Sequence, residues 1–303
     1  MDQQTLRRLI GEKAEEVNRL IQHALPEEKG EKVEVLRAMR YSTEAGGKRL
    51  RPLILLHVGD LYGADRRLTE PFAVALELIH TYSLVHDDLP AMDNDDLRRG
   101  KPTTHKVFGE GMAVLAGDGL LNYAYETALE AFRHANDQEG TDRVVQALEV
   151  LMKNAGVHGM IGGQCADLMA EKEEPASPAD TVLYIHEHKT AAMMESAFQI
   201  GAILGGASAE DTENLKQIAT DVGVAFQIRD DILDIEGDST LLGKPVGSDI
   251  EEGKLTFPAV SGMEKAKAEV ERRTDHALSL LGTLSVQDAF LQALIVSLTG
   301  REY

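Results

Sequence analysis

The sequence of 303 residues contains a single cysteine and no tryptophan. One cysteine, Cys165, excludes an intramolecular disulfide framework and is typical of a reducing compartment, so we expect a cytoplasmic protein with Cys165 buried. Aromatic residues make up only 5% of the chain, whereas Ala, Leu, Glu and Met are plentiful. Because this balance favours helices over strands, the composition predicts a helical protein.

Long apolar runs and positive charge are also scarce. No stretch approaches eighteen apolar residues, which predicts no membrane span, and residues 1–25 have the spacing of an amphipathic helix and no signal-peptide core. With 31 Lys and Arg against 51 Asp and Glu, the formal net charge is −20. Such a surface repels nucleic acids and anionic membranes, so we expect neither as a partner. An anionic small molecule would need metal ions or local groups of Lys and Arg to reverse the field.

Helical periodicity extends over nearly the whole chain. Residues 71–88, 191–206 and 212–238 are apolar on more than one face, which is typical of helices in the centre of a bundle. No window shows several alternating strands, and no low-complexity linker separates domains. We therefore predict one all-α domain over residues 1–303, a helical bundle with a central active-site cavity.

Two segments gather aspartates at the ends of apolar helices. The first, "HDDLPAMDNDDLRRG" (86–100), holds five aspartates within ten residues, and the second, "RDDILD" (229–234), places Asp230 and Asp234 on one helix face. Carboxylates on largely apolar helices need a positive partner. Oxygen ligands without cysteine suit Mg²⁺. The candidate ligands are Asp87, Asp88, Asp93, Asp230, Asp231 and Asp234.

Basic residues stand beside these aspartates and in Gly-rich segments. They occur in "GGKRLRP" (46–52), directly after the first aspartates, in "HEHKT" (186–190) and in the polar segment 236–254. Together with the acidic clusters they predict an anionic substrate bound with metal ions. We expect Arg49 to be an ordinary solvated side chain. The candidate phosphate-binding residues are Lys48, Arg51, Arg98, Arg99, Lys189, Lys244 and Lys254.

The same segments resemble, in the same order, the motifs of trans-prenyltransferases, the all-trans polyprenyl diphosphate synthases. "DDLPAMDNDDLRRG" is similar to the family's first aspartate-rich motif and "DDILD" to its second; the remaining similar segments are "GGKRLRP", "IHTYSLVHDD", "GGQCADL", "HKT", "FQIRDDILD" and "GKPVGSDIEEGK". The resemblance runs from about Gly46 to Pro258. Four residues separate Asp88 from Asp93. This spacing resembles that of bacterial farnesyl diphosphate synthases, taken as the closer match, and of plant-type geranylgeranyl diphosphate synthases.

The resemblance implies an enzyme that joins isopentenyl diphosphate head to tail to an allylic diphosphate and releases diphosphate. The implied substrates are dimethylallyl and geranyl diphosphate and the implied product is farnesyl diphosphate, with geranylgeranyl diphosphate as the alternative. It also implies three Mg²⁺ ions per active site and a homodimer.

The resemblance further implies roles for individual residues. Direct metal ligands would be Asp87, Asp93 and Asp230. Three further aspartates would contact the metal through water or lie behind these ligands: Asp88, Asp231 and Asp234. The allylic diphosphate would be held by Arg98, Lys189, Lys244 and Lys254. The carbocation would be stabilised by Thr190, Gln227 and the carbonyl group of Lys189. Isopentenyl diphosphate would be held by Lys48, Arg51, His80 and Arg99.

Three further positions follow from the resemblance. The aromatic Tyr82, beside the small Ser83, would form the floor that stops the product near C15. Gln164 and Asp167 match a segment that lines the site, without an assignable role. Arg301 would close over the site.

Four rival interpretations remain to be weighed. An EF-hand loop starting at Asp93 would need Gly at its sixth position and Glu at its twelfth, where Arg98 and Thr104 stand, so it is excluded. A terpene cyclase would share the fold but would not explain the cations predicted to hold a second diphosphate. A metal-binding regulatory module would not explain the scattered Lys and Arg. A silent regulatory subunit of a synthase would generally lack aspartates in one motif, and both motifs are complete here.

Overall fold

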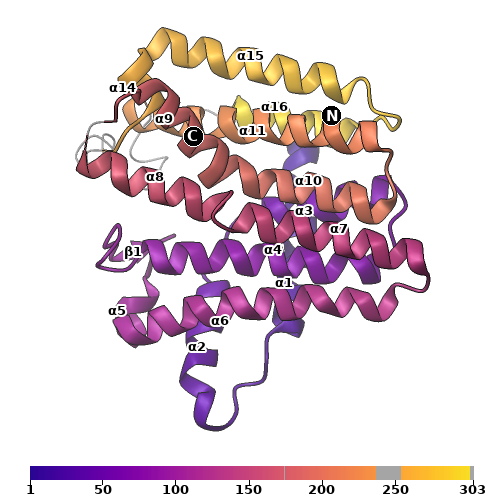
Figure 1. The fold of residues 1–303 in the computed structure, drawn as a ribbon, viewed down its shortest axis with the longest axis vertical. Helices are drawn as coiled ribbons and strands as arrows, with labels where there is room; N and C mark the ends of the chain where they lie inside the picture. The colour runs from indigo at the N-terminus through magenta and orange to yellow at the C-terminus, as the bar shows by residue number, and fades with distance from the viewer. Residues whose placement is uncertain (174, 237–253, 301–303) are drawn as a thin grey trace. The chain divides into compact units, whose positions relative to one another are not determined.

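The structure, a computed structural model, describes residues 1–173, 175–236 and 254–300. Within these ranges almost every regular element is a helix (Figure 1). The earlier elements are α1 (Gln3–Ala24), η1 (Gly30–Lys32), α2 (Val33–Thr43), α3 (Leu50–Leu61), α4 (Arg66–Asp87), β1 (Leu97–Arg98), β2 (Lys101–Pro102), α5 (Thr104–Phe108), α6 (Glu110–Leu129) and η2 (Glu130–His134). The later elements are α7 (Gln138–Ala155), α8 (Met160–Lys172), α9 (Pro178–Ile185), η3 (His186–Ala191), α10 (Ala192–Gly205), α11 (Ala209–Glu236), α14 (Phe257–Ser261), α15 (Met263–Leu281) and α16 (Ala289–Thr299).

The all-α prediction is confirmed. The strands β1 and β2, each of two residues, pair antiparallel within the loop that follows α4. In the described ranges, no helix is both long and apolar enough to cross a bilayer. Two residues of the predicted site, Lys244 and Arg301, lie outside the described residues.

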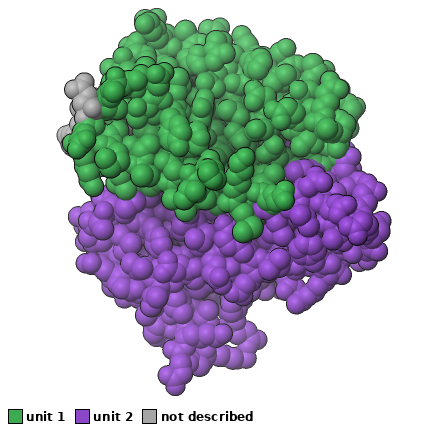
Figure 2. Space-filling model, in the orientation of Figure 1, with its two compact units in different colours: residues 1–6, 149–202, 207–303 green, residues 7–148, 203–206 purple. Residues whose placement is uncertain are grey.

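The chain falls into two compact units, which are coloured separately in Figure 2. Unit 1 comprises Met1–Leu6, Glu149–Ala202 and Ala207–Tyr303; unit 2 comprises Arg7–Leu148 and Ile203–Gly206. The divisions fall inside α1, α7 and α10, so they do not coincide with linkers. The single domain and the cavity between the two aspartate-bearing helices stay predictions.

Unit 2 is built around α4, which packs against α3 and α6. The side chain of Asp65 caps the helix by accepting a hydrogen bond from the Arg67 N–H at 2.9 Å. The apolar face of α4 is fully buried and includes Phe72, Leu76 and Ile79. The helix ends at Asp87, and Pro90 follows where a further turn would need its N–H. This packing presents the first acidic motif at the C-terminal end of α4.

Unit 1 is built around α11, which packs against α15 and η3. Figure 1 shows α15 running alongside α11. Apolar residues from five elements form its core: Val182, Ala191, Val224, Ala225, Ile228, Ile232, Phe257, Ala266 and Val270. Because the same helix continues to Glu236, the core fixes the second acidic motif in the last turns of α11.

Candidate active site

The first acidic motif folds back on the end of α4. The N–H of Asp93 donates to the carbonyl oxygen of Asp87 at 2.8 Å, so the backbones of these two candidate ligands lie side by side. Both residues are half-buried. Asn94, directly after them, has a φ of 54°, a left-handed conformation that Asn tolerates better than most residues. The sequence prediction that Asp87 and Asp93 act together is compatible with this turn.

Asp88 lies differently, because its carboxylate is buried and bound by Arg98. The Nε atom of Arg98 donates to Oδ1 of Asp88 at 2.8 Å, and Nη2 contacts the same oxygen and, at 2.9 Å, Oδ2 of Asp95. Burial raises the pKa of Asp88, although the hydrogen bonds from Arg98 act in the opposite direction. Arg98 is thus held among carboxylates at the rim of the motif.

Three residues predicted to hold isopentenyl diphosphate form a cation cluster in unit 2: Arg51, His80 and Arg99. Burial lowers the pKa of Arg51, the negative charge of Glu77 raises it, and the positive charge of Arg99 lowers it again. Burial likewise places the pKa of His80 well below its ordinary value, and Arg51 and Arg99 add to this effect. Within the described part of the chain, Nε of Arg51 is buried without a hydrogen-bond partner. The guanidinium groups of Arg51 and Arg99 thus lie near each other and near His80, an arrangement that an anion would stabilise.

Glycine allows Arg99 to reach this cluster. Its guanidinium donates to the carbonyl oxygen of Gly46. It also lies so close to Gly47 that a Cβ there would meet Cζ of Arg99 at 2.7 Å. Gly47 has a φ of 129°, which disfavours other residues as well. Lys48 follows directly, so the "GGKRLRP" segment lies beside Arg99, to which the resemblance assigns the same ligand.

The expectation for Arg49 is wrong, because this side chain is buried and not solvated. Its Nη1 atom donates to Oε1 of the buried Glu77 at 2.6 Å, and its Nε atom donates to Asn18 at 2.9 Å. Arg49 stands before α3 with a left-handed φ of 49°, which turns its side chain inward while Arg51 lies on α3 itself. Arg49 is a structural cation.

Tyr82 is buried on α4, five residues before Asp87. Its ring meets the ring of His86 edge-on, with centroids 5.8 Å apart, and burial raises the pKa of its hydroxyl. The half-buried Ser83 donates to the carbonyl oxygen of His80 at 2.9 Å. The predicted floor residue is thus a well-packed aromatic side chain close to the first acidic motif.

In unit 1 a cavity of about 310 Å³ brings together most of the second group of predicted residues. Its lining residues include Lys189, Thr190, Gln227, Asp230, Asp231, Asp234 and Lys254. Nζ of Lys189 donates to Oδ2 of Asp167 at 2.6 Å. Asp167, to which the sequence assigned no role, is thus a hydrogen-bond partner of Lys189. The neighbouring Gln164 is half-buried on α8 and its role stays unassigned. Cys165, expected to be buried, is exposed on the same helix, so that expectation is wrong.

Polar groups in this cavity form a chain. The hydroxyl of Thr190 donates to Oε1 of Gln227 at 3.0 Å, and Nε2 of Gln227 donates to Oδ1 of Asp231 at 3.3 Å. Asp231 also accepts from the backbone N–H of Phe257 at 2.9 Å, and Nε2 of His186 lies 3.4 Å from its Oδ2. Sequence reasoning did not single out His186, because its position beside "HKT" does not distinguish a buried histidine from an exposed one.

The residues Lys189 and Thr190 lie on η3, a π-helical turn. Such turns are rare and often occur at functional sites. Two glycines allow close packing against it: a Cβ on Gly163 would overlap the backbone of Lys189, and a Cβ on Gly223 would meet Cα of Ala191 at 2.6 Å. The sequence showed no signal for this departure from α-helix.

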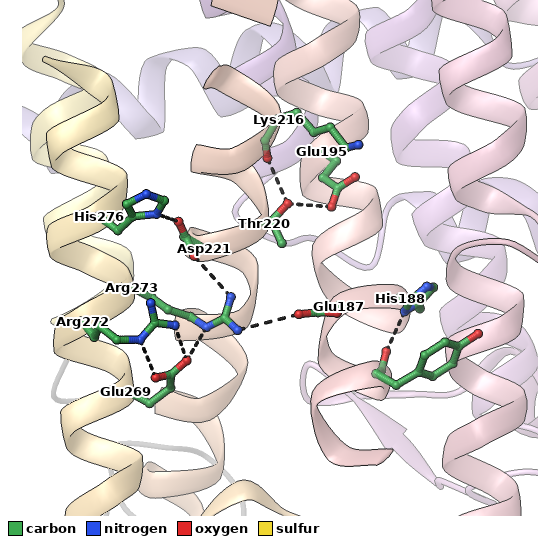
Figure 3. A network of polar contacts seen from close by, with 11 residues as sticks. Glu187, His188, Glu195, Lys216, Thr220, Asp221, Glu269, Arg272, Arg273 and His276 are labelled. Atoms are coloured by element: carbon green, nitrogen blue, oxygen red, sulfur yellow. Dashed lines mark hydrogen bonds and ion pairs between the residues drawn. The ribbon is translucent and has the colours of Figure 1, made fainter. Parts of the chain in front are cut away.

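Further from the cavity, opposite charges meet between α11 and α15 (Figure 3). We call the residues of this region the α11–α15 network: Asp221, Glu269, Arg272, Arg273 and His276. The buried Arg273 donates from Nη1 to Asp221 at 3.2 Å and from Nε to Glu269 at 2.7 Å. Nδ1 of His276 lies 2.6 Å from Oδ2 of Asp221. Each buried charge in the network faces an opposite charge or a hydrogen-bonding partner.

Among the residues that the structure describes, no three His, Cys, Asp or Glu side chains form a ready-made metal site. The cavity in unit 1 nevertheless offers carboxylate oxygens from Asp230 and Asp234 beside lysines. Mg²⁺ in proteins is usually held by one or two carboxylates, with waters and substrate phosphates completing its coordination. This donor set therefore fits a Mg²⁺ ion that binds together with a diphosphate.

Solved structures define the class of helical proteins to which this fold belongs. An apo FPP/GFPP synthase from Zymomonas mobilis matches with a TM-score of 0.84 and 34% identity, covering 96% of this chain and 97% of that one. A geranylgeranyl pyrophosphate synthetase from Pyrococcus horikoshii matches with a TM-score of 0.85 and 30% identity, covering 98% and 99%. The fold is therefore that of the all-α synthases.

The chain belongs to the polyprenyl synthetase family, whose model matches residues 32–289. It is 47% identical over 268 residues to a farnesyl diphosphate synthase of Geobacillus stearothermophilus, covering 88% of each chain. It is 44% identical over 284 residues to the large subunit 1 of a heterodimeric geranylgeranyl pyrophosphate synthase of Arabidopsis thaliana, covering 93% of this chain and 76% of that one. The predicted family and enzyme class are confirmed.

Proposed function

We propose that this protein is a farnesyl diphosphate synthase, which condenses isopentenyl diphosphate head to tail with dimethylallyl and then geranyl diphosphate. The observation that carries this proposal is the cavity in unit 1, where Lys189, Thr190 and Gln227 lie with the carboxylates of the second acidic motif. The similarity to a farnesyl diphosphate synthase at 47% identity supports the C15 product.

The allylic diphosphate is assigned to the unit 1 cavity. Lys189 and Lys254 supply positive charge for its phosphates, with Lys244 and Arg98 as further predicted contacts. When the carbon–oxygen bond to diphosphate breaks, charge accumulates on the departing oxygens, and cations placed there stabilise the transition state. The oxygens of Thr190 and Gln227 offer partial negative charge to the carbon left behind.

Isopentenyl diphosphate is assigned to the cation cluster. Its diphosphate stays attached during the reaction, so protein cations that bind without assisting departure are sufficient. Arg51, His80 and Arg99 form such a group, and the anion would relieve the repulsion between the two guanidinium groups. Lys48 completes the predicted set.

Magnesium is the proposed cofactor, with three ions per site as the family resemblance implies. Asp87, Asp93 and Asp230 are the proposed ligands, while Asp88, Asp231 and Asp234 act through water or behind them. When bound, Mg²⁺ would neutralise the charge that develops on the departing diphosphate. The carboxylate oxygens in the unit 1 cavity support this choice of ion.

Product analysis tests the proposed function. Purified protein is incubated with Mg²⁺, dimethylallyl diphosphate and isotopically labelled isopentenyl diphosphate, and the dephosphorylated products are separated by chromatography. Farnesol as the main product is the expected result. Geranylgeraniol would establish the alternative function instead, and no labelled prenyl alcohol would contradict prenyl transfer altogether.

We further propose that Tyr82 limits the product length. The Tyr82→Ala enzyme should release products longer than C15, because removal of a buried ring opens space one turn or more behind Asp87. Truncation of a buried aromatic residue costs about 3 kcal/mol, so folding is verified first by circular dichroism. Ser83→Ala is the matched control and should leave the product at C15. A folded, active Tyr82→Ala enzyme that still stops at C15 would remove Tyr82 from this role.

We also propose a cytoplasmic homodimer. Apolar side chains are exposed on α6, with Val114 at 41% and Leu115 at 54% exposure, and a second copy of the chain would cover them. Light scattering during size exclusion should give twice the monomer mass, and Leu115→Asp should shift it toward the monomer. A wild-type protein that elutes as a monomer at micromolar concentration would contradict the dimer.

A further inference from the structure

The carboxylate of Asp231 is the meeting point of three elements. It is 3% exposed, whereas the adjacent Asp230 is half-buried. Gln227 of α11 donates to Oδ1, the N–H of Phe257 at the start of α14 donates to Oδ2, and His186 of η3 lies 3.4 Å from Oδ2. Both oxygens are therefore engaged by nitrogen atoms of the protein.

This arrangement resembles a buried structural carboxylate more than a metal ligand. A buried carboxylate needs hydrogen-bond donors to replace lost water, and Asp231 has one on each oxygen. A metal ion bound directly to Oδ1 or Oδ2 would have to displace or crowd these donors.

Asp231 also determines how the amide of Gln227 is oriented. The Nε2 atom must face the carboxylate, because the reversed amide would place Oε1 against the negative oxygen. Oε1 then points toward the Thr190 hydroxyl, which donates to it at 3.0 Å. The orientation of both oxygen atoms in the cavity thus depends on Asp231.

The same carboxylate holds the segment that enters α14. Its bond from Phe257 at 2.9 Å ties this segment to α11, and Lys254 and Thr256 line the cavity just before it. His186 is buried on the other side, at 3% exposure, and its Nδ1 has no hydrogen-bond partner among the described residues. The imidazole of His186 therefore contacts Asp231 through Nε2 and is otherwise packed in the interior.

We propose that Asp231 and His186 are positioning residues, which hold Gln227, Thr190 and the segment before α14 in place. This inference rests on the proposed function, since the groups it positions are those assigned to the carbocation and the allylic diphosphate. It gives Asp231, which the resemblance only placed behind the metal ligands, the role of organising the cavity.

The test compares Asp231→Asn with Asp230→Asn. The first change should lower kcat by about tenfold or more, because small displacements of positioned groups are costly. It should leave the Mg²⁺ concentration for half-maximal activity unchanged. Asp230→Asn should raise this Mg²⁺ concentration. If Asp231→Asn raises it to the same extent as Asp230→Asn, Asp231 is a metal ligand and the inference is wrong.

Histidine 186 provides a second pair of variants in case Asp231→Asn does not fold. His186→Gln keeps a donor near the position of Nε2, whereas His186→Leu has a similar volume and no donor. We expect His186→Gln to retain most of the wild-type kcat and His186→Leu to lose it, with the same Mg²⁺ dependence. Equal activities of these two folded variants would overturn the positioning role of His186.

Two readouts do not depend on turnover. Calorimetry with Mg²⁺ and inorganic diphosphate should give wild-type binding for Asp231→Asn and weakened binding for Asp230→Asn. In ¹H–¹⁵N spectra, the side-chain amide of Gln227, assigned with Gln227→Glu, should exchange slowly in the wild type and rapidly in Asp231→Asn. If the wild type showed no prenyl transfer, the proposed function would fail, while these two readouts would still decide the structural inference. An unchanged Gln227 amide in Asp231→Asn would refute it.

Discussion

The cation cluster of unit 2 and the α11–α15 network of unit 1 differ in how their positive charges are compensated. The cluster brings Arg51, His80 and Arg99 together. Burial and nearby arginines lower the pKa of Arg51 and of His80, and for Arg51 the charge of Glu77 opposes this in part. The network surrounds the guanidinium of Arg273 with the carboxylates of Asp221 and Glu269 (Figure 3). Positive charge is offset only in part by Glu77 in the first region, whereas carboxylates in direct contact compensate it in the second.

This difference separates binding residues from structural ones. A group of like charges costs free energy in the free protein, and the cost is recovered when an oppositely charged ligand arrives. A compensated buried pair instead loses stability when one partner is removed. Within unit 2, the same contrast distinguishes Arg51 from Arg49, which pairs with Glu77 at 2.6 Å.

The largest expected effect comes from breaking the α11–α15 network. Arg273→Met should lower the free energy of unfolding by about 3 kcal/mol, because Asp221 stays buried beside His276 alone. The KM for isopentenyl diphosphate should not change. Urea denaturation measures the loss, and Arg272→Met is the control. Arg272 is 59% exposed, so its replacement should cost less than about 1 kcal/mol. Equal losses in the two variants would contradict the compensated role of Arg273.

A smaller effect is expected from the cation cluster, and it should appear in binding. Arg51→Met should raise the KM for isopentenyl diphosphate about tenfold or more, since a charged hydrogen bond to the diphosphate is lost. The free energy of unfolding should change little, because burial and Arg99 disfavour the charge of Arg51 while Glu77 favours it. Arg49→Met is the control, two residues away, and should lose about 3 kcal/mol of stability because Glu77 is left buried. If Arg51→Met lost as much stability as Arg49→Met, the distinction between Arg51 as a binding residue and Arg49 as a structural residue would be wrong.

The smallest effect is the pH dependence contributed by His80. Burial, with Arg51, Arg99, Arg49 and Arg98, holds its pKa in the folded protein well below the ordinary value of 6.5. As the pH falls, His80 therefore takes up a proton in the unfolded chain before it does so in the folded protein. The contribution of neutral His80 to the free energy of unfolding is complete above pH 6.5 and is lost as the pH falls from there toward the folded pKa. Denaturation at several pH values should show this loss in the wild type and a reduced loss in His80→Gln. The same pH dependence in both proteins would be evidence against the low pKa.

The sequence was sufficient for the helical fold, because apolar residues recur at helical spacing in segments such as 71–88 and 212–238. It also identified residues that the structure brings together within one unit, such as Thr190 with Gln227 and the "GGKRLRP" segment with Arg99. These successes depend on spacing along a helix and on ordered motifs.

The sequence failed where a residue's environment depends on distant parts of the chain. Arg49 and Arg51 are both Gly-flanked cations, and only the fold shows that Glu77 reaches the first of them. Cys165 is exposed although its residue type favours burial. Asp231 contacts Phe257, 26 residues later in the sequence, and His186, 45 residues earlier, and no local sequence pattern predicts either contact.

The binding of isopentenyl diphosphate to the cation cluster is tested most directly by thermal unfolding with this compound alone, which cannot react without an allylic partner. A ligand that binds only the folded state raises Tm with concentration. We predict that Tm rises in the wild type and equally in Arg273→Met, although that variant starts from a lower Tm, and that the rise is largely absent in Arg51→Met. An equal rise in Arg51→Met and the wild type would contradict the assignment of the cluster to diphosphate.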